Sequence, residues 1–319
     1  MGKFTFTPAD YQQAAIKYRK ELLMLPLIGI QSTLAYMTGR PGIRYAERVG
    51  EIDGDAQFAP YDPSNISDFD LKLALRELRT YFGSVVAEFE PNSAISTLLG
   101  TGATKGDGQM QTPTARAVLA LIAKKLAFHL NNAIWKAKRN EGGKTTMDLF
   151  DGFDTITQAE IDATNISEAK GNYMKISEEI TKANAVDVAK EILWSLDEHL
   201  RAETCYLYCS QKFLDLYNEA YKLTTGLIPY NQQYGHTAVE GSDNKLIFCP
   251  LSNKAGSDFI HVSPKRNMLV GYDQMGDVES VDVKEFKPFV LSYIATMFFG
   301  TQFESIDKRR LFVADLRNE

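Results

Sequence analysis

The sequence is poor in cysteine and histidine, and this scarcity excludes several kinds of site. Three cysteines occur among 319 residues, which is too few for a disulfide framework and indicates a reducing compartment. The four histidines are scattered along the chain, and Cys205 and Cys209 have no second pair of ligands near them. This spacing is weak evidence for zinc, so the sequence predicts no metal centre.

Long apolar runs and an excess of positive charge are also missing. The longest apolar stretches, 22–30 and 117–123, are much shorter than the ~20 residues that span a bilayer. No apolar signal-peptide core follows the first residues, so we expect a soluble protein made in a cytoplasm, without a membrane partner. Lys+Arg 35 against Asp+Glu 41 leaves a net charge of -6, which argues against a protein that wraps nucleic acid.

Signatures of catalysis are absent as well. The glycine-rich segment 100–106 has the spacing of neither a phosphate loop nor a dinucleotide-binding loop. No Gly-x-Ser-x-Gly or His-Glu-x-x-His motif occurs, and turns or solvated strand edges explain the clustered aspartates. We therefore expect no catalytic residue, no cofactor and no enzymatic activity.

The residues that are present predict an α+β fold. Helices are expected at 112–140, 185–201 and 210–223, with short buried strands at 205–209 and 245–249 between and after the last two. Residue 258 begins a strand-rich region with segments at 259–262, 268–271, 278–283, 288–297, 300–304 and 311–314. The early strand of comparable quality is 80–90, so the ends of the chain should meet in one sheet with an α/β subdomain inserted between them.

The strand at 80–90 and the helix at 112–140 both carry apolar stripes. In the strand, Val85, Ala87 and Phe89 share one side, while Ser84, Glu88 and Glu90 share the other. The helix, about 43 Å long, has one apolar face through Leu119, Ile122, Leu126, Leu130, Ala133 and Ala137, and a second through Leu121, Phe128 and Trp135. Either the second stripe meets another molecule, or the helix lies between two layers of one domain. On the helix at 185–201, Trp194 is expected to point away from the apolar face.

The N-terminal part of the chain is less regular. A helix is predicted from Thr7 to about Leu25, followed by an irregular arm over 27–43. Residues 44–70 then carry few apolar side chains and predict a long projecting loop or hairpin, with a flexible acidic loop as the alternative. Seven acids lie there against Arg44 and Arg48: Glu47, Glu51, Asp53, Asp55, Asp62, Asp68 and Asp70.

The most informative segment is 263–273, which reads Ser-Pro-Lys-Arg-Asn-Met-Leu-Val-Gly-Tyr-Asp between an apolar strand and the strand-rich tail. It resembles the major capsid proteins of tailed bacteriophages, which share the Hong Kong 97-type shell fold. That family has a Thr/Ser-Pro-Lys-x-Asn-Leu turn followed by a Val-x-Gly-x-Asp strand. The order of the predicted elements agrees with the family over nearly the whole chain.

The resemblance implies a division of the chain into the regions of that capsid fold. These regions are an N-terminal arm (1–38), an extended loop (39–72), a peripheral domain with a long spine helix (73–145), an inserted axial α/β domain (146–271), return strands of the peripheral domain (272–305) and a C-terminal strand (306–319).

The resemblance also implies a function. The chain would be a major capsid protein that self-assembles as hexamers and pentamers into an icosahedral shell enclosing double-stranded DNA, without sequence-specific contact. It would be assembled in the cytoplasm of a bacterial host and found in the virion capsid. Candidate partners are scaffolding, portal and decoration proteins. Two alternatives are an encapsulin-type compartment shell and, from another class, a soluble α+β enzyme of unknown type.

Candidate contact residues follow from the same resemblance. Glu47, Glu51, Asp53 and Asp55 of the acidic loop would pair with basic patches on adjacent subunits. Arg309 and Arg310, or the basic residues at 136, 138 and 139, are candidates for those patches. Trp135 and Trp194 are candidate apolar contacts. No lysine occurs between Lys20 and Lys72, so covalent crosslinking from the extended loop is not expected.

Overall fold

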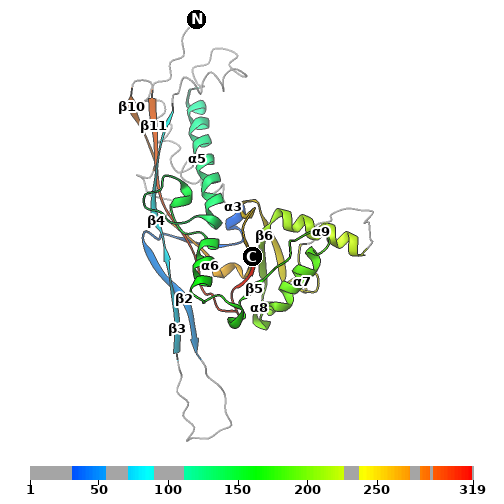
Figure 1. Cartoon of the computed structure of the whole chain (residues 1–319). Helices are drawn as coiled ribbons and strands as arrows, with labels where there is room; N and C mark the ends of the chain where they lie inside the picture. Colours follow the sequence, from blue (N-terminus) through cyan, green and yellow to red (C-terminus); the bar gives the residue numbers. More distant parts are fainter. Residues whose placement is uncertain are drawn as a thin grey trace.

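The computed structural model describes residues 31–54, 71–89, 111–225, 237–273, 281–287 and 290–317. Within these ranges the chain forms two five-stranded sheets, a separate two-stranded ribbon and the helices that join them (Figure 1). The predicted α+β class is therefore confirmed. The helix predicted from Thr7 lies outside the described residues, as does Asp55.

The first sheet brings early and late segments of the chain together. Its strands are β1 (Thr38–Pro41), β4 (Tyr81–Phe89), β9 (Met268–Tyr272), β10 (Val281–Lys287) and β11 (Val290–Phe303). Strand β11 pairs antiparallel with β10, β4 and β9 along its length, so the predicted meeting of the early strand with the late strands is confirmed.

Two expectations for this sheet are corrected. The strands predicted at 288–297 and 300–304 form one strand, because Gly300 continues the ladder opposite Gly271 instead of ending it. The arm predicted as irregular over 27–43 contains a short helix, α3 (Gln31–Leu34), and strand β1. The Thr-Gly-Arg-Pro sequence of β1 has low β-propensity, and parallel pairing with β9 holds it extended.

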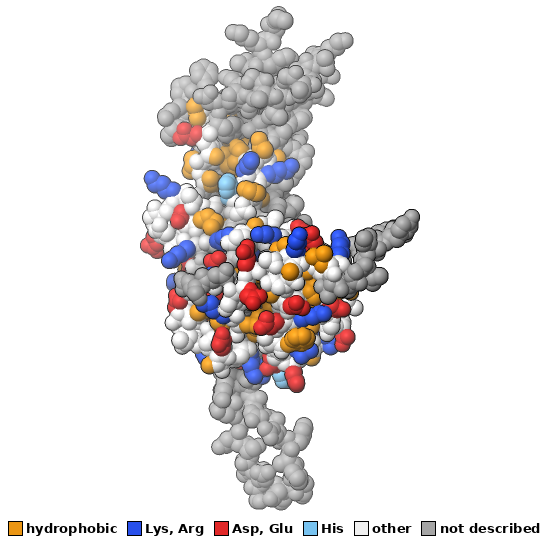
Figure 2. All heavy atoms as spheres, turned by 45° about the vertical axis from the view of Figure 1, so that its right-hand side comes forward, with side chains coloured by type: hydrophobic (Ala, Val, Ile, Leu, Met, Phe, Trp, Pro, Cys, Tyr) orange, Lys and Arg blue, Asp and Glu red, His pale blue; other side chains and the backbone are white. Residues whose placement is uncertain are grey.

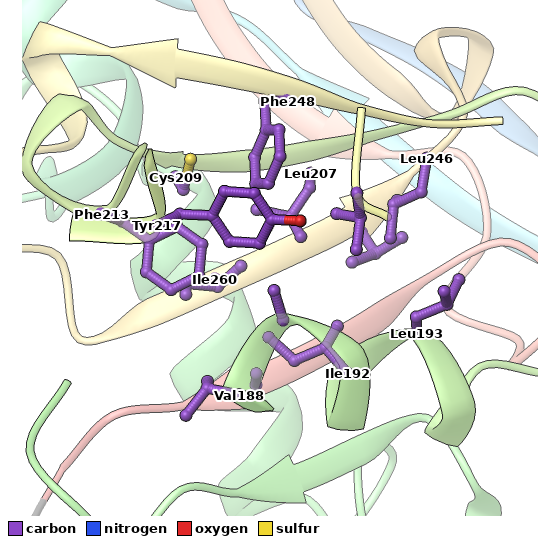
Figure 3. Packing of buried hydrophobic residues seen from close by; sticks show 14 of the residues in the cluster. Val188, Ile192, Leu193, Leu207, Cys209, Phe213, Tyr217, Leu246, Phe248 and Ile260 are labelled. Atoms are coloured by element: carbon purple, nitrogen blue, oxygen red, sulfur yellow. The ribbon is translucent and has the colours of Figure 1, made fainter. Parts of the chain in front are cut away.

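The second sheet has the order β5-β12-β8-β6-β7. Its strands are β5 (Tyr173–Lys175), β12 (Phe312–Asp315), β8 (Phe259–Ser263), β6 (Cys205–Ser210) and β7 (Leu246–Leu251). Helices α7 (Ala185–Ser195) and α9 (Gln211–Thr225) pack on it, with Val188 and Ile192 among the buried side chains around Leu207 and Phe248 (Figure 3).

The two sheets cross the domain boundaries that the resemblance implies. Strand β9, which falls mostly at the end of the inserted segment 146–271, pairs in the first sheet with β1 and β11. Strand β12, from the C-terminal segment, lies in the second sheet between β5 and β8. The turn at 263–268 is thus the crossing point at which the chain leaves one sheet and enters the other.

Hydrogen bonds of the Asn267 side chain stabilise this crossing turn. Its side chain is fully buried, and its amide donates to the Ser263 hydroxyl at 2.9 Å and to the Arg310 carbonyl at 3.2 Å. Its Oδ1 accepts the Ser305 backbone N–H at 2.7 Å. The asparagine of the sequence motif therefore joins the crossing turn to the segment that precedes β12.

Helices α5 (Gln111–Lys136) and α6 (Phe153–Asp162) fill the space between the sheets. One buried cluster combines Ile134 of α5 and Phe153 of α6 with Phe299 of the first sheet and Tyr208 of the second. Sequence reasoning missed α6, because its few buried positions, Phe153, Asp154 and Thr157, include two polar residues and show no apolar period.

Two predicted helices end early for local reasons. Helix α5 stops at Lys136 instead of about 140, since the N–H groups of Lys138 and Arg139 bind the Met147 carbonyl and the Asp151 carboxylate. The helix expected over 185–201 is two helices, because Leu196 is extended and Asp197 caps α8 (Glu198–Ala202).

Four short 3-10 turns complete the described elements. They are η1 (Thr146–Asp148), η2 (Glu168–Lys170), η3 (Ser252–Lys254) and η4 (Lys265–Asn267).

Gly300 offers a test of the first sheet. A Cβ at this position would overlap the carbonyl oxygen of Arg79, where the chain passes into β4. We expect Gly300→Ala to lower the free energy of unfolding by about 1–3 kcal/mol, as overpacking does. Gly142→Ala is the matched control, because its Cβ would meet only the Asn140 side chain at 3.7 Å. Equal urea midpoints for the two variants would contradict the close approach at Gly300.

Candidate subunit interface

A two-stranded ribbon projects from the body of the subunit (Figure 1). Strands β2 (Ala46–Gly54) and β3 (Leu71–Arg79) pair antiparallel, from Ala46 opposite Arg79 to Gly54 opposite Leu71. Of the two forms predicted for this region, loop or hairpin, its described part is a hairpin. Its base is held by a small buried cluster of Ile43, Val49, Leu78 and Leu269. A ribbon of two strands alone is marginal in water, so this cluster is important for holding the ribbon against the body of the chain.

The ribbon is less acidic than the sequence stretch 44–70 indicates. Its register sets Arg48 opposite Glu77 and Asp53 opposite Lys72. Lys72 lies on β3, just beyond the end of the acid-rich stretch, and is brought alongside it only by strand pairing. Of the predicted contact residues, Glu47 is half-buried, and Glu51 and Asp53 lie on β2 towards the tip.

The two tryptophans occupy opposite environments. Trp135 has an exposed fraction of 0% and lies 5.4 Å from the Phe153 ring and 5.8 Å from the Tyr208 ring. It belongs to the subunit's own core, so its assignment as a subunit contact is corrected. Trp194 is 69% exposed on α7 and points away from the apolar face, as predicted.

The correction for Trp135 has a simple cause. Spacing by seven places Trp135 in line with Leu121 and Phe128, and both of those are exposed. Only the last turn of α5, however, is enclosed by α6 and by β6 of the second sheet. Figure 2 shows hydrophobic side chains gathered beside lysines and a histidine at the level of α5, where Leu121 and Phe128 lie among exposed Lys124, Lys125 and His129.

A second exposed apolar surface lies on the first sheet. Phe82 and Val86 of β4 are exposed, and the Phe82 ring lies 5.0 Å from Phe298 of β11. Exposed Tyr45 meets the same Phe298 ring at 5.7 Å. Sequence reasoning described this side of the strand as polar, from Ser84 and Glu88. The overlooked signal is that side chains alternate along a strand, so Phe82 and Val86 lie on the same side as Ser84 and Glu88.

Arg309 and Arg310 both have acidic partners within their own chain. Arg310 Nη1 lies 3.1 Å from Glu203 Oε2, which Arg266 Nη2 also contacts at 2.9 Å. Arg309 Nε lies 3.0 Å from Asp307 Oδ1. Arg266 and Arg310 thus share Glu203, and both predicted basic residues are engaged within their own chain.

A cluster of polar side chains is buried beneath Trp135. Lys254 Nζ contacts Asp154 Oδ1, Ser257 Oγ and His261 Nδ1, each at 3.1 Å. Burial lowers the pKa of His261 well below 6.5, and the neighbouring Lys254 lowers it further. Burial also lowers the pKa of Lys254, against the opposing effect of Asp154.

The three cysteines are buried and free. Burial raises the pKa of Cys205 and of Cys209 to about 12, so their thiols stay protonated and are poor nucleophiles. Among the described residues, no group of three or more His, Cys, Asp and Glu side chains is arranged to hold a metal ion. In the same ranges, no helix is both long and apolar enough to cross a membrane.

Comparison with known proteins identifies the fold. No protein-family model matches the chain, and no curated protein matches its sequence. A chain of the satellite phage P4 procapsid, which includes the size determination (Sid) protein, matches with a TM-score of 0.56 at 14% identity. The match covers 92% of this chain and 89% of that one. A chain of the empty GTA particle capsid matches with a TM-score of 0.54 at 11% identity, covering 90% of each chain.

A third match is to the holo-SrpI encapsulin complex from Synechococcus elongatus PCC 7942. This match covers 89% of this chain and 86% of that one at 13% identity. Its TM-score of 0.49 is too low for the match to support a conclusion. The two higher matches extend over nearly the full chain, so the protein has the α+β fold of phage capsid proteins, as the resemblance implies.

The environments of the two tryptophans can be tested with the same substitution. Trp135→Ala leaves a cavity between the sheets, so we expect a loss of about 3–5 kcal/mol in the free energy of unfolding. Trp194→Ala removes an exposed ring, and the change should stay within about 0.5 kcal/mol. Urea unfolding of the unassembled chain measures both, and a similar cost at the two positions would contradict the placement of Trp135.

Because burial keeps His261 uncharged, we expect the free energy of unfolding to decrease in mild acid. The unfolded chain binds a proton at this histidine near pH 6.5, whereas the folded chain does not, so stability falls as the pH drops below that value. Lowering the pH from 7.5 to 5.5 should therefore lower the free energy of unfolding by on the order of 1 kcal/mol through this group.

Urea midpoints across this pH range measure the slope. His261→Gln should flatten this slope, whatever its effect on stability at pH 7.5. An unaltered slope in His261→Gln would contradict the assignment.

Proposed function

We propose that this chain is the major capsid protein of a tailed bacteriophage, which assembles as hexamers and pentamers into an icosahedral shell around double-stranded DNA. The observation that carries the proposal is the near full-length match to chains of the P4 procapsid and the GTA capsid. Both matched chains come from assembled shells, and that context supports self-assembly of this chain.

The distribution of exposed apolar residues supports the same proposal. Phe82 and Val86 lie on the first sheet, Leu121 and Phe128 on α5, and Trp194 on α7 beside the second sheet. Contiguous exposed apolar surface, such as that of Phe82 and Tyr45 around Phe298, is the kind that marks an interaction site on a soluble protein. A shell subunit has neighbours on several sides, and each of these surfaces would be buried against a different copy.

The projecting ribbon fits this role, because a ribbon that lies on a neighbouring copy gains the layer that it lacks alone. We assign β2 and β3 to the extended loop, α5 to the spine helix, and the second sheet with α7 and α9 to the axial domain. Glu47, Glu51, Asp53 and Asp55 are the proposed acidic contacts of the ribbon. Arg309 and Arg310 are proposed partners on an adjacent copy, where an incoming carboxylate would compete with Asp307 and Glu203.

Scaffolding, portal and decoration proteins are proposed partners, and the virion capsid, assembled in the bacterial cytoplasm, is the proposed location. An encapsulin-type compartment uses a related shell, so the contents of the particle distinguish the two functions. Particles from the native source should protect double-stranded DNA from nuclease. A cargo enzyme inside a DNA-free particle would favour the compartment shell.

Assembly can be tested on the purified chain. We expect size-exclusion chromatography and negative-stain electron microscopy to show rings of five or six subunits, tubes or closed shells. The double variant Phe82→Ser with Val86→Ser should raise the concentration needed for assembly about tenfold or more, since about 1.4 kcal/mol of lost contact is enough for that change.

The matched control is the double variant Ser84→Ala with Glu88→Gln, on the same side of the same strand. It should assemble as the unmodified chain does, and urea unfolding should confirm that both double variants fold. A wild-type chain that stays monomeric at high concentration would contradict the proposed function, and unchanged assembly of the Phe82 and Val86 variant would exclude that surface as a contact.

A further inference from the structure

The buried cluster beneath Trp135 has no role in the proposed assembly, and it joins three elements that are distant in the sequence. Asp154 lies in the first turn of α6, Lys254 ends η3, and His261 is in the middle of β8. Lys254 has an exposed fraction of 1% and His261 of 0%. An amine, a carboxyl group and an imidazole are thus enclosed together in the core.

We propose that Lys254 and Asp154 condense within the folded subunit to form an isopeptide bond between Lys254 Nζ and Asp154 Cγ. The reaction joins an amine to a carboxylic acid and releases one water molecule. It needs no oxidant, metal or activated ester. The proposal is independent of whether the chain forms a shell.

The geometry brings the reacting groups together. Lys254 Nζ lies 3.1 Å from Asp154 Oδ1, which is bonded to the carbon that the amine would attack, so the two groups are held next to each other by the fold. Asp154 Oδ2 has no hydrogen-bond partner in the described part of the chain, so the carboxyl group meets the amine through Oδ1, which is the oxygen that takes the proton and leaves. Burial lowers the pKa of Lys254, which makes the neutral, nucleophilic amine more accessible than it is in free lysine.

The surroundings favour condensation over hydrolysis. The indole of Trp135 covers the amine, with Nζ 3.7 Å from the ring. Phe153 packs against Trp135, and Phe303 packs against both Phe153 and His261. These aromatic side chains restrict water on their side of the cluster, while the Asp154 side chain is 11% exposed, so the released water can depart to solvent.

His261 is positioned to move the protons. Its Nε2 lies 2.8 Å from Thr157 Oγ1, and we assign the Nε2 proton as donated to that hydroxyl. Its Nδ1 is then a free acceptor, 3.1 Å from Lys254 Nζ and 3.9 Å from Asp154 Oδ1. Nδ1 is therefore within hydrogen-bond distance of the amine that loses a proton, and a movement of less than 1 Å would bring it to the carboxyl oxygen that receives one.

The step balances as follows. A proton passes from the ammonium group to the carboxylate, which leaves a neutral amine and a carboxylic acid. Nζ attacks Cγ and forms the C–N bond, and His261 Nδ1 accepts the proton that the nitrogen then releases. The imidazolium returns this proton to the hydroxyl on Cγ, the C–O bond breaks, and water departs with the imidazole neutral again.

The bond would link positions 100 residues apart, through the core that joins the two sheets. A crosslink over so long a loop restricts the unfolded chain strongly, as a disulfide does. The linked subunit would retain this connection after denaturation, when every noncovalent contact of the core is lost.

Mass spectrometry of the full chain tests the proposal. We expect most purified, denatured chains to be lighter than the sequence mass by one water molecule. Proteolysis should give a joined fragment that contains both Asp154 and Lys254, and tandem spectra should place the bond between them. Lys254→Met and Asp154→Ala chains should each have the full mass calculated from their sequence. Both variants are expressed in the same way as the wild-type chain, so that any removal of terminal residues changes all the masses equally.

Lys136→Met is the matched control, because Lys136 is an exposed lysine nearby whose Nζ binds the Ala255 carbonyl. It should keep the mass deficit. His261→Gln, refolded from denaturant alongside a freshly synthesised wild-type chain, should form the bond about 100-fold more slowly, which is the usual contribution of a general acid–base group.

The wild-type mass decides the matter even if a core variant fails to fold. Full sequence mass after prolonged incubation of the folded chain at neutral pH would overturn the proposal, as would a deficit located at another pair of residues. An equal rate of bond formation in a folded His261→Gln chain would overturn the role of His261 alone.

Discussion

The packing of α5 between two sheets is the contact on which the arrangement of this subunit depends. Trp135, in the last turn of α5, contacts Phe153 of α6 and Tyr208 of the second sheet, while residues of β9 and β11 complete the same core. Because this core is shared, the two sheets and the helix form one body. Among the described residues, Leu121 and Phe128 of α5 and Phe82 and Val86 of β4 lie outside this core and are exposed.

The interior of the chain contains paired polar side chains, whereas its exposed surface carries large apolar ones. Inside, two buried polar side chains are closely paired: Asn267 binds three partners at the crossing between the sheets, and Lys254 has three polar contacts beneath Trp135. Outside, large apolar side chains such as Phe82 and Trp194 are left uncovered. A protein that completes its burial only by association is expected to show this contrast.

Much of the fold was accessible from local patterns. The alternation of the strand at 80–90, the helical period of α5 and the order of strands after residue 258 all correspond to elements of the structure. The turn beginning at Ser263 carried the resemblance to capsid proteins, and the comparison with solved structures supports that fold. Helix α6 and the break at Leu196 were missed, because a helix with buried polar residues and a cap within an apolar run leave no periodic signal.

By itself, the sequence determined which residues share a side of each strand or helix, because that depends only on the local repeat of the backbone. Only the tertiary structure decided which of those sides is covered. Trp135 and Phe128 lie seven residues apart on one helix, yet the first is enclosed by α6 and β6 while the second is exposed. Likewise Lys72 meets the acidic strand through pairing, and Asp154 meets Lys254 across 100 residues. Which side chains are buried, and which charged residues lie next to each other, depends on contacts between segments that are distant in the sequence. A local sequence pattern carries no information about those contacts.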